Sequence, residues 1–144
     1  MKDTVLEFDE DCVSAIGEAF AKVVRQEKYT CYACAIMPDH VHVLIRRHRD
    51  QAEQMIANLQ RESHIGLRDA GLRTMEHPVW GGKGWKVFLE DEHDIRRTIA
   101  YVKDNPIKIR LPKQRWSFVT PYDGCVGGRV TVVRGRNDAQ SNGL

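Results

Sequence analysis

The sequence lacks the features that mark membrane and secreted proteins. No apolar run approaches the roughly 20 residues that a membrane-spanning helix requires. The chain also does not open with the basic and then apolar segments of a signal peptide, and it contains no internal repeat or low-complexity tract. From these absences we expect a cytoplasmic protein without a membrane partner.

A strong charge imbalance is also missing. The chain has 144 residues, of which 42% are hydrophobic and 29% are charged, and its net charge is +2. These values are typical of one globular domain that is long enough to bury a core. We expect a single domain over residues 1–134, followed by a disordered tail over residues 135–144.

Cysteine is scarce, with four residues in the chain, and in the cytosol we expect them to be free thiols. Cys31 and Cys34 have a C-x-x-C spacing that admits a zinc or redox site. The surrounding "YTCYACAIM" is typical of a strand, in which side chains three positions apart point to opposite faces. We therefore interpret both as buried apolar residues. A zinc site of Cys31, Cys34, His40 and His42 is the least favoured alternative.

Hydrophobic periodicity predicts an α+β fold. The spacing of apolar residues, the turn residues and the acidic helix starts indicate the order helix, strand, strand, helix, strand, helix. A small antiparallel sheet with the helices packed on one face accommodates this order. The predicted elements are helices over 10–27, 52–70 and from 91 to a stop at Pro106, strands over 29–37, 40–46 and 85–89, and a late strand in "GRVTVVRG".

The strand "HVHVLIR" carries two histidines on one face. Residues two apart on a strand point the same way, with about 7 Å between them, so His40 and His42 share a face while Val41 and Val43 point into a core. A pair of imidazoles in this arrangement is suited to holding a cation. Such a cation needs a further protein ligand from another element.

The last predicted helix offers candidates for that ligand. Its apolar stripe consists of Ile95, Ile99 and Val102. Arg97, Tyr101 and Asn105 follow an i, i+4, i+8 spacing and share a different flank. Tyr101 is therefore either a packing residue at the edge of the core or a functional residue beside an amide and an arginine.

Basic residues occur in local clusters, and such clusters can bind phosphate groups even when the net charge is small. Each cluster is either a phosphate-binding patch or an ordinary solvated face. The clusters are Arg46, Arg47 and Arg49, then Arg96 and Arg97, then the basic residues from Lys103 to Arg115, and then Arg129, Arg134 and Arg136. The candidates for DNA binding are Arg46, Arg47, Arg96, Arg97 and Lys103.

The segment "MPDHVHVLI", followed about sixty residues later by "IAYVKDNP", resembles the HUH single-tyrosine transposases. This family includes small insertion-sequence transposases and the REP-associated tyrosine transposases. The resemblance extends from about Asp11 to Gly124. It implies a ferredoxin-like or RRM-like HUH fold, and here the first strand of that fold has little room, since only "DTVLEF" precedes the first helix. A missing strand would expose a sheet edge and favour dimer formation.

The resemblance also implies an activity. Matched to the family motif, His40, His42 and Asn105 are implied to bind Mg²⁺ or Mn²⁺. Tyr101 is implied to attack single-stranded DNA and form a 5′-phosphotyrosine. The implied partner is single-stranded DNA from hairpin-forming element ends, and the protein is expected to be a monomer or a homodimer. The alternative is a catalytically inactive module that binds a DNA or RNA hairpin.

Overall fold

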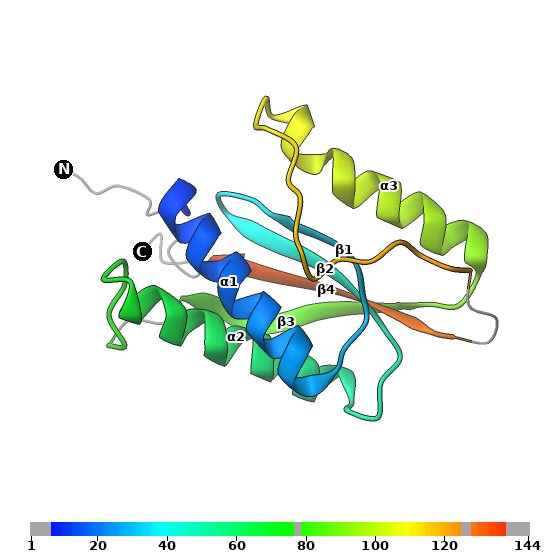
Figure 1. Cartoon of the computed structure of the whole chain (residues 1–144), viewed down its shortest axis with the longest axis horizontal. Helices are drawn as coiled ribbons and strands as arrows, with labels where there is room; N and C mark the ends of the chain where they lie inside the picture. The colour runs from blue at the N-terminus through cyan, green and yellow to red at the C-terminus, as the bar shows by residue number, and fades with distance from the viewer. Residues whose placement is uncertain (1–6, 77–78, 125–127, 138–144) are drawn as a thin grey trace.

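The described residues of the chain form one four-stranded sheet with three helices (Figure 1). The computed structural model describes residues 7–76, 79–124 and 128–137, with no side chains described for residues 82–85. The α+β class and the antiparallel sheet are confirmed. The elements are α1 (Glu10–Glu27), β1 (Cys31–Ile36), β2 (His40–Arg46), α2 (Ala52–Asp69), β3 (Trp80–Leu89), α3 (Glu92–Lys108) and β4 (Val130–Asn137).

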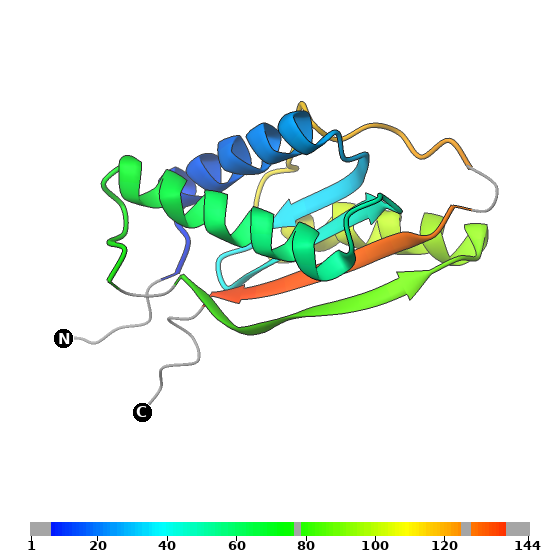
Figure 2. The same ribbon diagram turned by 90° about the horizontal axis from the view of Figure 1, so that it is seen from below.

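The strand order is β1-β2-β4-β3, and every neighbouring pair is antiparallel. The strand latest in the sequence, β4, therefore lies inside the sheet, between β2 and β3 (Figure 2). The edge strands of this sheet are β1 and β3, and the expectation that a missing first strand exposes an edge stays a prediction. Most of "DTVLEF" lies outside the described residues; within it, Phe8 is buried and donates its backbone N–H to Pro38 O at 2.9 Å.

The helices cover both faces of the sheet. On one face, α1 and α2 lie side by side (Figure 2) and pack on Val41, Val43 and Ile45. On the other face, α3 packs on Leu44 and on apolar residues of β1 and β4. The expectation that all helices share one face is therefore wrong for α3. The physical reason is that β2 has apolar residues on both sides, since Leu44 follows the two histidines.

A local sequence signal sets the start of α1, whereas the proline signal does not set the end of α3. The bounds of α1 agree with the predicted helix over 10–27, because Asp9 accepts a hydrogen bond from Cys12 N at 2.9 Å and caps the first turn. Pro106 does not stop α3, which continues to Lys108. Proline removes one N–H but its φ is compatible with a helix, and Pro106 O still accepts bonds from Ile109 N and Leu111 N.

Two predicted boundaries near glycine residues are also wrong. The strand expected to begin at residue 85 begins at Trp80, so the glycine-rich "GGKG" belongs to β3, with a register shift between Gly81 and Trp85. The disordered tail predicted for residues 135–144 is wrong for residues 135–137, because β4 continues through Asn137. Residues 138–144 lie outside the described residues.

Side chains from the segment after α3 protect the outer edge of β1. Gln114 bonds to both backbone groups of Ile36, at 2.9 and 2.8 Å, and Trp116 Nε1 donates to Cys34 O at 3.1 Å. Thr120 N donates to Cys31 O at 2.9 Å. An edge strand whose backbone groups already form hydrogen bonds has fewer free N–H and C=O groups for pairing with another chain. None of the described helices combines the length and apolarity needed to cross a membrane.

Candidate active site

The β1–β2 hairpin places the two histidines together at the start of β2. Met37 N donates to His40 O at 2.7 Å and closes the turn that precedes the strand. The ring centroids of His40 and His42 are 4.8 Å apart, so the predicted shared face is confirmed. His42 is buried, with 7% of its surface exposed.

Asp39 orients the more accessible imidazole. Its Oδ1 lies 2.6 Å from His40 Nδ1. In the neutral form of the ring, a carboxylate at this distance accepts the Nδ1–H and leaves Nε2 with a free lone pair, as for metal-binding histidines held by a neighbouring carboxylate.

Asn105 reaches the second imidazole from α3. Its Nδ2 lies 3.0 Å from His42 Nδ1, and Asn105 is buried with 8% of its surface exposed. A half-turn of the amide exchanges Nδ2 and Oδ1, so the same side chain can present either a donor or an oxygen ligand at this position.

Burial keeps His42 neutral. Desolvation, together with the charges of His40 and Arg134, lowers the pKa of His42 from 6.5 to about 4. A neutral imidazole has a lone pair available near neutral pH, which is the form that binds a metal ion.

Tyr101 lies at the rim of this cluster. Its ring centroid is 6.3 Å from that of His42, and 53% of its surface is exposed. Lys108 Nζ lies 4.4 Å from the centre of the same ring. The exposed ring is therefore not a core residue. Arg97, the third member of the predicted flank, forms an ion pair with Asp94.

The donor set fits a divalent cation. Two neutral imidazoles and an amide oxygen provide three ligands at most, which leaves positions for water and phosphate oxygens, as Mg²⁺ sites in phosphoryl-transfer proteins commonly have. The described residues contain no group of three or more His, Cys, Asp or Glu side chains suited to a metal. A cation at the two imidazoles would therefore need the amide of Asn105 as its third protein donor.

The cysteines lie away from this cluster. A register shift between Cys31 and Ala33 places Cys31 and Cys34 in the same core cluster, on the α1–α2 side of the sheet. The prediction that the two side chains point to opposite faces is wrong because the bulge adds one residue. They are free, buried thiols. Burial raises the pKa of Cys31 to about 12, which disfavours the thiolate that zinc binds, and the histidines lie on the other face.

The predicted DNA-binding residues do not form one patch. Arg46 and Arg47 lie at the opposite end of β2 from His40. Arg96 pairs with Glu92 at 2.9 Å and stacks over Tyr122 at 5.0 Å. Lys103 lies on α3 beside a small groove of 220 Å³.

Two arginines on β4 lie directly across the sheet from the histidines. In the strand register Arg134 is opposite His42 and Arg136 is opposite His40. The sequence pattern predicts this basic cluster but not its position beside the histidines. The signal was "VRGR", which has the same two-residue spacing as "HVH".

The aromatic residues near the sheet have structural contacts. Trp80 Nε1 donates to Ser63 Oγ at 2.9 Å, and its ring meets Phe8 edge-on at 5.4 Å. Tyr122 meets Tyr32 edge-on at 5.0 Å. Trp80 is therefore a packing residue on the α1–α2 side of the sheet.

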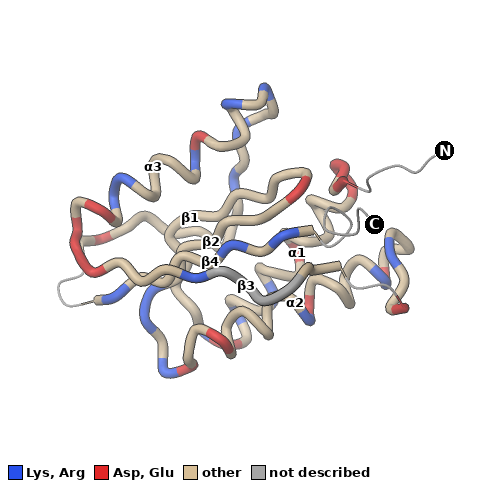
Figure 3. Tube along the Cα trace, turned by 180° about the vertical axis from the view of Figure 1, so that it is seen from behind, with Lys and Arg blue, Asp and Glu red and all other residues tan. Residues whose placement is uncertain are grey.

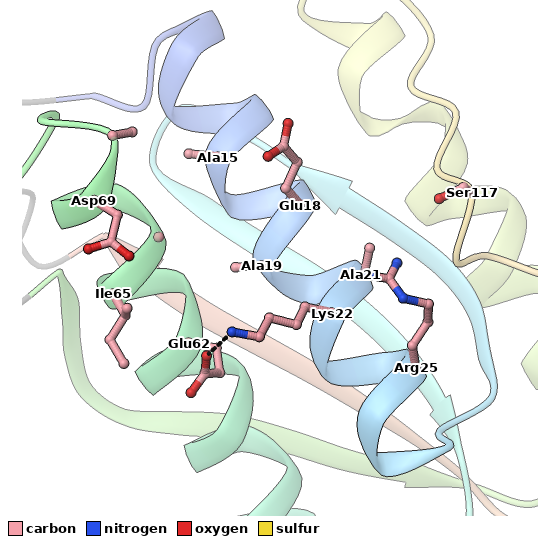
Figure 4. A pocket seen from close by; sticks show the side chains of 12 residues that line it. Ala15, Glu18, Ala19, Ala21, Lys22, Arg25, Glu62, Ile65, Asp69 and Ser117 are labelled. Carbon is pink, nitrogen blue, oxygen red and sulfur yellow. Dashed lines mark ion pairs between the residues drawn. The ribbon is translucent and has the colours of Figure 1, made fainter.

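The pocket between α1 and α2 has a volume of 640 Å³ and offers little chemistry (Figure 4). Alanine residues line much of it, and Lys22 forms a 3.6 Å ion pair with Glu62 across it. It lies on the face of the sheet opposite the histidines. The candidate site is therefore the cluster of His40, His42, Asn105 and Tyr101.

Comparison with known families agrees with this geometry. The family model described as "Transposase IS200 like" matches residues 2–105, a region that contains the HVH strand and Tyr101 and ends at Asn105. No curated protein and no solved structure gave a significant match. A match over this much of the chain shows the family: the protein belongs to the IS200-like transposases.

Proposed function

We propose that the protein cuts and rejoins single-stranded DNA, with Tyr101 as nucleophile and with His40, His42 and Asn105 as ligands of Mg²⁺ or Mn²⁺. The observation that carries the proposal is the convergence of β2 and α3. Asn105 lies 3.0 Å from one imidazole, and the Tyr101 ring centroid is 6.3 Å from that of the same residue.

Tyr101 forms the new bond. Its phenolic oxygen attacks phosphorus in line with the leaving 3′ oxygen, so the Oη–P bond forms as the P–O3′ bond breaks. The products are a 5′-phosphotyrosine and a free 3′-OH. The phenolic proton passes to water, and the leaving oxygen takes a proton from solvent. When bound, the cation supplies charge neutralisation at the scissile phosphate. The reverse attack by a 3′-OH restores the DNA without ATP.

The chain's own residues support this reaction in separate ways. Asp39 fixes the ring of His40, and the buried environment of His42 keeps that ring neutral. The exposure of Tyr101 leaves room for a phosphodiester beside its hydroxyl.

The substrate we propose is single-stranded DNA that flanks a hairpin. A phosphodiester inside a stacked duplex is less accessible to a tyrosine on a helix than one in an unpaired strand. All four site residues come from one chain here, so we propose a site that is complete within a monomer, in the cytosol where chromosomal DNA is available.

The test is covalent capture of DNA. A hairpin-bearing single-stranded oligonucleotide with Mn²⁺ is expected to give an adduct that survives denaturing electrophoresis. Tyr101→Phe is expected to abolish the adduct and His42→Ala to reduce it strongly, while Tyr122→Phe, the matched control, retains it. DNA binding without any adduct, unchanged in Tyr101→Phe, would instead establish a non-cutting hairpin-binding module.

A further inference from the structure

We infer that Arg134 and Arg136 of β4 form a phosphate-binding pair that holds the backbone of a DNA strand against the two histidines. This inference rests on the proposed function and extends it to a part of the chain outside the region that the family model matches, which ends at residue 105.

The strand register places the pair. Arg134 is opposite His42 and Arg136 is opposite His40 in the β2–β4 ladder. Directly opposed residues of an antiparallel pair project from the same face of the sheet. Both arginines are exposed, and basic positions follow one another along the second half of β4 (Figure 3).

The residue between them fixes the direction in which they point. Gly135 lies under Trp80 on the other face, where an added Cβ would lie 3.2 Å from Trp80 Cε3 and 3.4 Å from Val41 Cγ2. A larger residue would disturb that packing, so position 135 faces the α1–α2 side of the sheet. Alternation then directs the two neighbouring arginines outward on the histidine side.

The two guanidinium groups have no anionic partner among the described residues. The other arginines of the candidate set on α3 are paired, Arg96 with Glu92 and Arg97 with Asp94. Within the described part of the chain, neither Arg134 nor Arg136 takes part in an ion pair or a side-chain hydrogen bond. Two unneutralised charges beside the histidine pair are positioned to attract an anion.

Phosphodiester groups match this arrangement in charge and in shape. A guanidinium binds phosphate oxygens through two parallel N–H groups, and its charge does not depend on pH in the physiological range. Two positions on a strand are about 7 Å apart, a spacing comparable to that of neighbouring phosphates in an extended nucleic acid strand. The pair would therefore hold successive phosphates without reading the base sequence.

The test measures DNA binding without metal. A fluorescein-labelled, hairpin-bearing single-stranded oligonucleotide is titrated with protein in EDTA at several salt concentrations, and anisotropy reports the dissociation constant. For single strands, each phosphate contact contributes about 0.7 to the slope of log affinity against log salt. One contact therefore raises the affinity about fivefold when the salt concentration falls from 1 M to 0.1 M. Arg134→Gln and Arg136→Gln are each expected to lower the slope and the affinity by about these amounts.

Two further variants separate charge from fold. Arg25→Gln removes an exposed arginine from α1, on the opposite side of the sheet, and is expected to leave the slope unchanged. Arg134→Lys keeps the charge and is expected to retain most of the slope. A wild-type slope and affinity in both glutamine variants overturns the inference, and so does an equal loss in Arg25→Gln.

The binding test of the arginine pair and the adduct test of the proposed function can fail independently. If the wild-type protein forms no covalent adduct but the arginine variants lose affinity, cutting is refuted and the phosphate-binding pair stands. If the adduct forms and the arginine variants bind DNA as wild type does, the pair is refuted and cutting stands.

Discussion

Asn105 Nδ2 and His42 Nδ1 lie 3.0 Å apart, although 63 positions separate the two residues in the sequence. This contact joins α3 to β2 on the face of the sheet that α1 and α2 leave uncovered. Both side chains are buried, so each depends on the other for a polar partner. The same contact brings Tyr101, one turn earlier on α3, to the rim of the histidine pair.

Replacement of Asn105 is expected to weaken metal binding. Asn105→Ala removes the only amide donor proposed for the cation, and loss of a supporting polar group at a metal site typically costs about 10- to 100-fold in affinity. Asn105→Asp is expected to bind Mn²⁺ more tightly than the wild-type protein, because a carboxylate is a stronger ligand for a hard cation. Isothermal titration with Mn²⁺ measures both changes.

Asp104→Asn is the matched control for this experiment, since Asp104 is an exposed neighbour on the same helix. It is expected to leave the Mn²⁺ affinity close to that of the wild-type protein. Equal affinities in wild type and Asn105→Ala would remove Asn105 from the ligand set.

The pKa of His42 is expected to be far below that of an ordinary histidine. Its pKa is lowered from 6.5 to about 4, first by burial. Between these two pH values the unfolded state binds a proton that the folded state does not, so the free energy of unfolding rises with pH. The stabilisation is complete above pH 6.5 and is lost as the pH falls towards 4.

NMR titration of the histidine Cε1–H signals in EDTA checks this prediction. The His42 signal, assigned by its loss in His42→Gln, is expected to have a midpoint near 4, and the thermal stability of His42→Gln is expected to depend less on pH in this interval. His93→Gln, at an exposed position on α3, is the control. A His42 midpoint near 6.5 contradicts the buried site.

Gly17 permits the close approach of the segment that protects β1. An added Cβ would lie 3.0 Å from Cε3 and Cη2 of Trp116 and closer still to Cζ3. Gly17→Ala is therefore expected to destabilise the protein by about 1–3 kcal/mol through overpacking, despite the better helix propensity of alanine. Urea denaturation measures the change.

Gly66→Ala provides the comparison in α2. Its added Cβ would make an ordinary contact of 3.4 Å with Ala19 Cβ, so helix propensity dominates and the variant is expected to be as stable as the wild type or more stable. A Gly17→Ala variant as stable as Gly66→Ala would show that Trp116 does not pack as described.

Local patterns in the sequence predicted the parts of the site that lie within one element. The shared face of His40 and His42 follows from strand alternation, and α1 follows from its apolar spacing and its cap. The relation of Tyr101 to Asn105 follows from helical spacing. The pairing of α3 with the histidine face did not follow, because an amphipathic helix does not specify which side of a sheet it covers.

Features that depend on non-local pairing were missed for the same reason. The segment "GRVTVVRG" does not predict that β4 lies between β2 and β3, so Arg134 and Arg136 could not be placed beside the histidines. The bulge after Cys31 was also invisible, because it depends on the register with β2. A single inserted residue there places Cys31 and Cys34 on the same face of the sheet instead of on opposite faces.

The most direct test of the central claim is the chemical identity of the covalent product. Wild-type protein is incubated with hairpin-bearing single-stranded DNA and Mn²⁺, digested with nuclease and protease, and analysed by tandem mass spectrometry. The account predicts a nucleotide joined through its 5′ phosphate to Tyr101. A nucleotide found on another residue, or joined through a 3′ phosphate, would contradict it.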